Sequence, residues 1–204
     1  MRDLDRLAAR FLSGAERLLL EFGPSVVSSC EPDPPAGRLF LAESRVRGLQ
    51  ALISMIFGDR ELEVRTSVHP YGRPWALELG YYLEAMGMDS EPVRNSMWIN
   101  DEKRLGAVLR RQATGLRECL RGLDADADAL WYAAEATRQQ AIRSARARMR
   151  RRETRVAVHR AREAFGAGQY RRVVALLTPY EDILSDAQRR RLNLAESRLR
   201  PPER

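Results

Sequence analysis

The chain has 204 residues, of which 44% are hydrophobic, and a net charge of +7, so it can bury one ordinary core or a compact core with a helical extension. Its longest apolar runs, Leu52–Phe57 and Val173–Leu177, are far too short to cross a bilayer. Asp3 and Asp5 stand where a signal peptide would be basic, so we predict a soluble, cytoplasmic protein with no membrane partner.

The first segment has the spacing of an amphipathic helix. Its apolar residues recur every three or four positions, and Gly23-Pro24 predicts its end. We expect this apolar face to pack on a core. It consists of Leu4, Leu7, Ala8, Phe11, Leu12, Ala15, Leu18, Leu19 and Phe22.

Residues 25–69 change to the two-residue period of strands. The third strand candidate is apolar on both faces, which is typical of a central strand, whereas the fourth has one polar face. A proline-rich loop at residues 31–37 and a Gly58-Asp59 turn separate neighbouring strands. We predict an antiparallel meander of three or four strands, covered on one face by the first helix. The candidates are Val26-Val27, Arg38–Ser44, Leu49–Phe57 and Glu61–His69.

Helical patterns dominate after residue 70. Pro74 suits the first turn of a helix that runs to about Met86, and residues 101–122 predict another helix. A third begins near Asp126 and runs to Ala164 (residues 126–164), an unusual length for a globular helix. The pattern predicts an α+β fold, with an α+β domain at residues 1–100 followed by an all-helical region at residues 101–204.

The string Ala161–Leu177 resembles the centre of a tetratricopeptide repeat. The resemblance implies a helical hairpin over residues 156–199, completed by a last helix that Ser185 and Gln188 open as a capping box. One such unit is visible, and its second helix has valine where the repeat usually has alanine. The matching residues are Gly168 at the turn, Tyr170 as a wedge between the helices, and Val173 and Leu177 facing back.

The excess positive charge lies in one stretch. Residues 138–172 contain 12 arginines and two acidic residues, a net charge of +10, whereas the net charge is −4 for residues 1–137 and +1 for residues 173–204. Lys103 is the only lysine, so the abundance of arginine reflects a compositional bias. That bias does not explain why acidic residues are nearly absent from this stretch.

Three interpretations of the arginine stretch are open. The arginines form a solvated helix neutralised by the acidic N-terminal domain, within the chain or in a homo-oligomer; they dock an acidic face of a protein partner; or they clamp nucleic-acid phosphates. Residues 138–164 contain no aromatic side chain that could stack on bases, which disfavours recognition of single strands. The candidate contact residues are Arg143, Arg146, Arg148, Arg150, Arg151, Arg152, Arg155 and, in the hairpin, Tyr170.

An acidic segment offers a candidate metal site. Asp124, Asp126, Asp128 and Glu135 match the ligand positions of a calcium-binding EF-hand loop. However, Ala129 replaces the glycine that makes the sharp turn of such a loop. The alternative is an acidic link in which Asp126 or Asp128 caps the following helix, and we prefer it.

The chain offers few side chains for catalysis. Cys30 and Cys119 lie far apart without metal-ligand spacing, and we expect both to be buried free thiols of a reducing compartment. His69 and His159 have no nucleophile or acid beside them in a recognisable motif. The sequence therefore predicts no cofactor, no metal and no catalytic residues.

The N-terminal helix before a strand pair, a helix opening near Trp75, and the string Leu176–Asp182 ahead of a capped helix form a recognisable layout. It resembles small uncharacterised bacterial proteins, some of them immunity or toxin-linked partners. The resemblance implies a partner-binding role without catalytic residues. We predict a non-catalytic protein-binding module, an adaptor or a toxin-neutralising immunity protein. The alternative is nucleic-acid binding through the arginines, and the third candidate is an enzyme of unknown class.

Overall fold

The computed structural model describes residues 2–30, 39–46, 48–49, 51–58, 62–94 and 98–200. The chain divides into two compact units, residues 1–139 and 140–204, and each has its own buried apolar cluster. Helix α4 (Glu102–Gly166) contributes to both units. Its residues 102–139 bury their apolar side chains in the core of the first unit, although the sequence pattern grouped them with the helices that follow.

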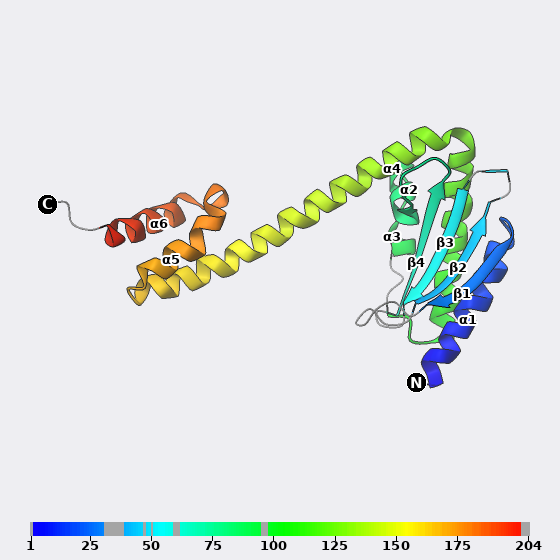
Figure 1. Ribbon diagram of the computed structural model, residues 1–204, viewed down its shortest axis with the longest axis horizontal. Helices are drawn as coiled ribbons and strands as arrows, with labels where there is room; N and C mark the ends of the chain where they lie inside the picture. The colour runs from blue at the N-terminus through cyan, green and yellow to red at the C-terminus, as the bar shows by residue number, and fades with distance from the viewer. Residues whose placement is uncertain are drawn as a thin grey trace. The chain divides into compact units, whose positions relative to one another are not determined.

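Five antiparallel strands form the sheet of the first unit. They follow chain order across the sheet, as a meander requires, and Figure 1 shows the first four side by side. This confirms the predicted α+β class and the predicted meander. The sheet has five strands, whereas three or four were expected. The strands are β1 (Ser25–Cys30), β2 (Leu39–Arg45), β3 (Ala51–Gly58), β4 (Glu63–Pro70) and β5 (Leu77–Glu78).

The central position predicted for the third strand is confirmed, because β3 pairs with β2 on one side and β4 on the other. Ile53, Met55 and Phe57 of β3 are fully buried, while the residues between them are half-exposed. Phe57 lies beside Phe40 of β2 and Phe11 of the first helix, with ring centroids 6.2 and 5.5 Å away. The buried face of the sheet is therefore the face that meets the helices.

Helix α1 (Arg2–Leu19) and the first half of α4 pack on that face (Figure 1). The two helices touch closely, because a Cβ added to Gly14 would lie 2.7 Å from Leu109. Arg6 and Arg10 of α1 each place a guanidinium nitrogen 3.1 Å from the Glu102 carboxylate. The predicted amphipathic helix is confirmed, and it ends at Leu19, before the Phe22 end expected from the pattern.

The helix predicted from Pro74 to Met86 is wrong in its first half. Residues 77–78 form β5 instead, and helix α2 covers only Leu79–Ala85. Leu77 is buried and lies opposite Val68 of β4, so pairing and burial outweigh the helix-start signal of the proline. A short helix that the pattern did not predict, α3 (Glu91–Arg94), follows.

Some predictions fall on positions that the structure does not describe. The loop at residues 31–37, Asp59 of the predicted turn and the side chain of Cys30 lie outside the described residues. The other cysteine, Cys119, is buried with a free thiol, as expected.

The second unit is entirely helical. After α4 it contains α5 (Tyr170–Leu177), the 3₁₀ helix η1 (Thr178–Ile183) and α6 (Asp186–Leu199). The predicted capping box is present, because the Ser185 amide donates to Gln188 Oε1 over 2.8 Å and the reciprocal bond also forms. Among the described residues, no helix has the length and the apolar composition that crossing a membrane requires.

Candidate protein-binding groove

The seven predicted contact arginines are all exposed on the second half of α4. The same helix has one buried stripe, whose members follow one another at intervals of three or four residues. These residues, Thr154, Ala157, Ala161 and Ala164, have small side chains that let neighbouring helices approach closely. The arginines therefore occupy the solvent-facing part of the helix and leave one narrow side for packing.

A glycine turn connects α4 to α5. Gly168 has a φ of +71°, a backbone conformation that favours glycine. The Gln169 amide donates to the Ala164 carbonyl and the Gly168 amide to the Phe165 carbonyl, which together form a Schellman motif. The turn predicted at Gly168 is thus confirmed, and it sends the chain back along α4.

The second unit has a small core around this turn. Val173 and Leu177 of α5 are buried with Ala161 of α4, as the hairpin prediction required. Tyr170 is half-buried and packs edge-on against Phe165, with ring centroids 5.5 Å apart. Tyr170 therefore acts first as a packing residue between the two helices.

A groove with a volume of about 740 Å³ lies between α4, α5 and η1 of the second unit. Met149 and Val156 lie seven residues apart on α4 and line the groove. Their side chains are 65% and 47% exposed. A contiguous patch of exposed apolar side chains indicates a binding surface, whereas single exposed apolar residues are common on any protein. The groove is lined by the apolar Met149, Val156, Ala157, Ala175, Leu176, Pro179 and Tyr180, and by the charged Arg148, Arg152, Glu153 and Arg160.

Positive charge dominates the composition of the second unit. Residues 140–204 contain 17 arginines and seven acidic residues, a net charge of +10, whereas residues 1–139 have a net charge of −3. Arg150 pairs with Asp182 of η1 at 2.7 Å, and it is the only one of the seven predicted arginines with a carboxylate partner in the described part of the chain. Most of the arginine charge is therefore available to an outside partner.

The structure brings together part of the predicted site. Arg148 and Arg152 line the groove, whereas Arg143, Arg146, Arg150, Arg151, Arg155 and Tyr170 are not among its lining residues. The sequence prediction did not include the apolar side of the groove, which contains Met149 and Val156 of the arginine stretch. The seven-residue spacing of Met149 and Val156 was the available signal.

The acidic link behaves as the preferred interpretation predicted. Asp126 leaves the helical conformation, with φ −159° and ψ 92°, and breaks α4 at that point. Its Oδ1 accepts a hydrogen bond of 2.9 Å from the Ala129 amide, which is the geometry of an N-cap. Asp128 pairs with Arg73 instead of turning toward Asp126.

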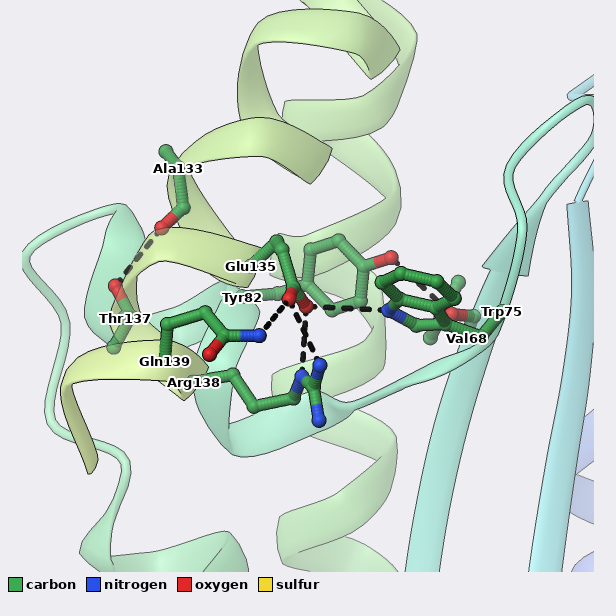
Figure 2. Close-up of polar contacts among 8 residues, drawn as sticks. All are labelled: Val68, Trp75, Tyr82, Ala133, Glu135, Thr137, Arg138 and Gln139. Atoms are coloured by element: carbon green, nitrogen blue, oxygen red, sulfur yellow. Dashed lines mark hydrogen bonds and ion pairs between the residues drawn. The ribbon is translucent and has the colours of Figure 1, made fainter. Parts of the chain in front are cut away.

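Glu135, the last residue of the proposed calcium set, is bound by other side chains (Figure 2). Its carboxylate accepts hydrogen bonds from Arg138 at 2.7 and 2.8 Å, from Gln139 at 2.6 Å and from the Trp75 indole at 3.2 Å. These bonds, led by that of Arg138, lower the pKa of Glu135 to about 2. Within the described residues, no group of three or more histidine, cysteine or acidic side chains is placed to hold a metal ion.

Cysteine and histidine, the usual nucleophile and base of catalytic sites, lie in other environments in this chain. Burial raises the pKa of the Cys119 thiol far above its ordinary value, so the thiolate required of a nucleophile does not form near neutral pH. His69 forms a 2.8 Å hydrogen bond between Nε2 and the Arg73 carbonyl. His159 is exposed on α4, 3.7 Å from Glu163.

No protein-family model matches this chain, and the searches of curated proteins and of solved structures also found no match. The resemblances to a tetratricopeptide repeat and to immunity-like proteins therefore rest on the sequence pattern alone.

Proposed function

We propose that this protein is a non-catalytic binding module whose groove in the second unit takes an acidic, amphipathic segment of a partner protein. One observation carries the proposal, namely that exposed apolar residues and arginines line the same groove. A partner helix with leucines on one side and carboxylates along its edges would contact the apolar residues and pair with the arginines at the same time.

The composition of the groove favours a protein over a nucleic acid. Phosphate backbones need positive charge but gain little from apolar contacts such as Met149, Val156 and Leu176. Arginine pairs with carboxylates through two parallel hydrogen bonds, and its planar group also packs on apolar surface. Glu153 interrupts the positive rim and would repel a uniformly acidic ligand at that point.

We place this module in the class of adaptors and toxin-neutralising immunity proteins. The support is the layout that resembles immunity-like bacterial proteins, and the absence of a catalytic constellation among the described residues is compatible with it. Since the groove is basic, the partner would present an acidic face. The acidic first unit of another copy of the chain could also occupy the groove. In that case the protein would self-associate in solution.

The test uses the full-length protein and a fluorescent amphipathic peptide of about 20 residues, long enough for a helix of roughly 30 Å. The peptide carries leucine on one face and glutamate on its flanks. Simultaneous Arg148→Glu, Arg152→Glu and Arg160→Glu substitutions should weaken binding by at least about tenfold, measured by fluorescence anisotropy. Replacing Met149 and Val156 with serine should weaken it by a similar factor while leaving its salt dependence unchanged.

The matched control substitutes Arg171, Arg190 and Arg198 with glutamate. These three arginines are also exposed in the second unit, and none lines the groove. The control changes the net charge equally, so an equal loss of binding in both triple variants would reject the groove. Tighter binding to a DNA duplex than to the peptide, with a steep salt dependence, would favour the nucleic-acid alternative.

A further inference from the structure

A second cavity lies in the first unit. Its volume is about 260 Å³, and its walls come from β4, β5, the start of α2, α3 and the first half of α4. In the described part of the sheet, β5 pairs only with Ser67 and Val68 of β4, so residues 63–66 have an open edge there. The cavity occupies the space beside this edge.

Two buried polar side chains in the cavity wall each have an oxygen atom without a hydrogen-bond partner among the described residues. Gln112 is 1% exposed, and its Nε2 donates a 2.8 Å hydrogen bond to the Val93 carbonyl, which fixes the amide and leaves Oε1 unpaired. Thr66 of β4 is 3% exposed, and its hydroxyl has no partner among the described residues. A buried polar atom without a hydrogen bond is costly. Gln112 Oε1 needs a donor, and the Thr66 hydroxyl can accept a hydrogen bond as well as donate one.

The cavity wall holds two arginines and two glutamates, and both arginines are paired with carboxylates. Arg94 is held by Glu84, with nitrogen and oxygen 2.7 Å apart, and its guanidinium lies 4.7 Å from the centre of the Tyr81 ring. Arg65 forms an ion pair of 2.8 Å with Glu63. Glu78 is exposed at the cavity and has no ion-pair partner in the described part of the chain.

We propose that this cavity binds a small molecule through a primary ammonium group. An ammonium offers three donors and one positive charge, which match the Gln112 carbonyl, the Thr66 hydroxyl and the Glu78 carboxylate. The cavity is several times the volume of one water molecule, about 30 Å³, yet smaller than most drug-sized sites. A short alkylamine is therefore the matching chemical class.

The experiment titrates the full-length protein with n-propylammonium and follows the Gln112 side-chain amide by NMR. We expect a saturable shift of that signal. Tetramethylammonium has the charge without donors, and propionate has the opposite charge, so neither should produce it. An equal response to tetramethylammonium, or no saturation with propylammonium at tens of millimolar, would overturn the proposal and leave a water-filled cavity.

Variants separate binding from folding. Thr66→Val and Glu78→Gln keep the side-chain shape, and each should weaken propylammonium binding by about tenfold, the equivalent of one charge-assisted hydrogen bond. The controls are Thr114→Val and Glu91→Gln, which change exposed residues that are not among the lining residues. Unchanged affinity in Thr66→Val and Glu78→Gln, with circular dichroism showing a native fold, would also refute the proposed site.

Discussion

Glu135 shows how one charged residue connects distant parts of the first unit. Trp75 precedes β5, whereas Glu135, Arg138 and Gln139 stand on α4, and the carboxylate joins all of them (Figure 2). Trp75 also packs on Trp131, with ring centroids 5.9 Å apart. Of the four hydrogen bonds to this carboxylate, the one from Trp75 holds the loop before β5 against the helix, and those from Arg138 and Gln139 fix the carboxylate within α4. Charge-assisted bonds of this kind are stronger than neutral ones.

Replacing Glu135 with glutamine should destabilise the protein by about 1–2 kcal/mol at neutral pH, because the charge-assisted bonds to Arg138 are lost. The folded-state pKa of about 2 lies below the ordinary value of 4.5, so the carboxylate stabilises the fold above about pH 4.5. That stabilisation is lost as the pH falls toward 2. Urea unfolding at neutral and acidic pH measures it.

The difference between Glu135→Gln and the native protein should shrink as the solution is acidified. Glu16→Gln, at an exposed position of α1, serves as the control and should change stability little at any pH. A difference that stays constant down to pH 3 would contradict the role assigned to the Glu135 carboxylate.

Helix α4 shows how local backbone chemistry divides one long element. The chain from 102 to 166 is helical except at Asp126, where the N-cap restarts the helix. At its other end, Gly166 is the last helical residue and Gly168 takes the left-handed conformation that turns the chain. Two glycines two positions apart thus have different conformations, and their substitutions should differ in sign.

Gly168→Ala should destabilise the second unit by about 1 kcal/mol, because an alanine in the left-handed region is strained. No atom lies within 4 Å of the added Cβ, so the cost comes from the backbone alone. Gly166→Ala also meets open space, but in a helical position, and should be neutral or stabilising by up to about 1 kcal/mol. Thermal unfolding of both variants by circular dichroism tests the contrast, and equal effects would contradict it.

At the scale of the whole molecule, the two units differ sharply in the size of their cores. The described residues of the second unit include seven in its buried cluster, and three of those are alanines. The first unit buries a much larger set that spans the sheet and helices α1, α2, α3 and α4. All three tryptophans, Trp75, Trp98 and Trp131, belong to the first unit. Tryptophan fluorescence therefore reports on the first unit alone, whereas circular dichroism reports on the helices of both units.

Leu192→Ala, in the centre of the small cluster, should cost about 2–5 kcal/mol and unfold the second unit first. Circular dichroism should then show a lower midpoint in urea, while tryptophan fluorescence keeps its native midpoint. Ile53→Val in the first core is the reciprocal control and should move the fluorescence midpoint. Coincident shifts by both probes in Leu192→Ala would mean that the units unfold together.

The elements with regular periodicity were predictable from the sequence. The apolar face of α1, the two-sided β3 and the capped start of α6 follow from local spacing, because burial of one face or a cap leaves a repeated residue pattern. The break at Asp126 and the turn at Gly168 were also predictable, since each depends on the backbone chemistry of one residue. The charge of the arginine stretch was predictable as well, because it is a property of composition.

Long-range contacts decided the rest. Leu77 pairs with Val68 and turns a predicted helix start into a strand, and Trp75 meets Glu135 across 60 positions of chain. The groove exists only because α5 and η1 fold back beside Met149 and Val156. The second cavity is likewise lined by residues far apart in the chain, from Glu63 to Gln112. The sequence by itself determined the period of each element and the location of its charge. The tertiary structure alone decided which faces meet, because the energy of those contacts comes from residues far apart in the chain.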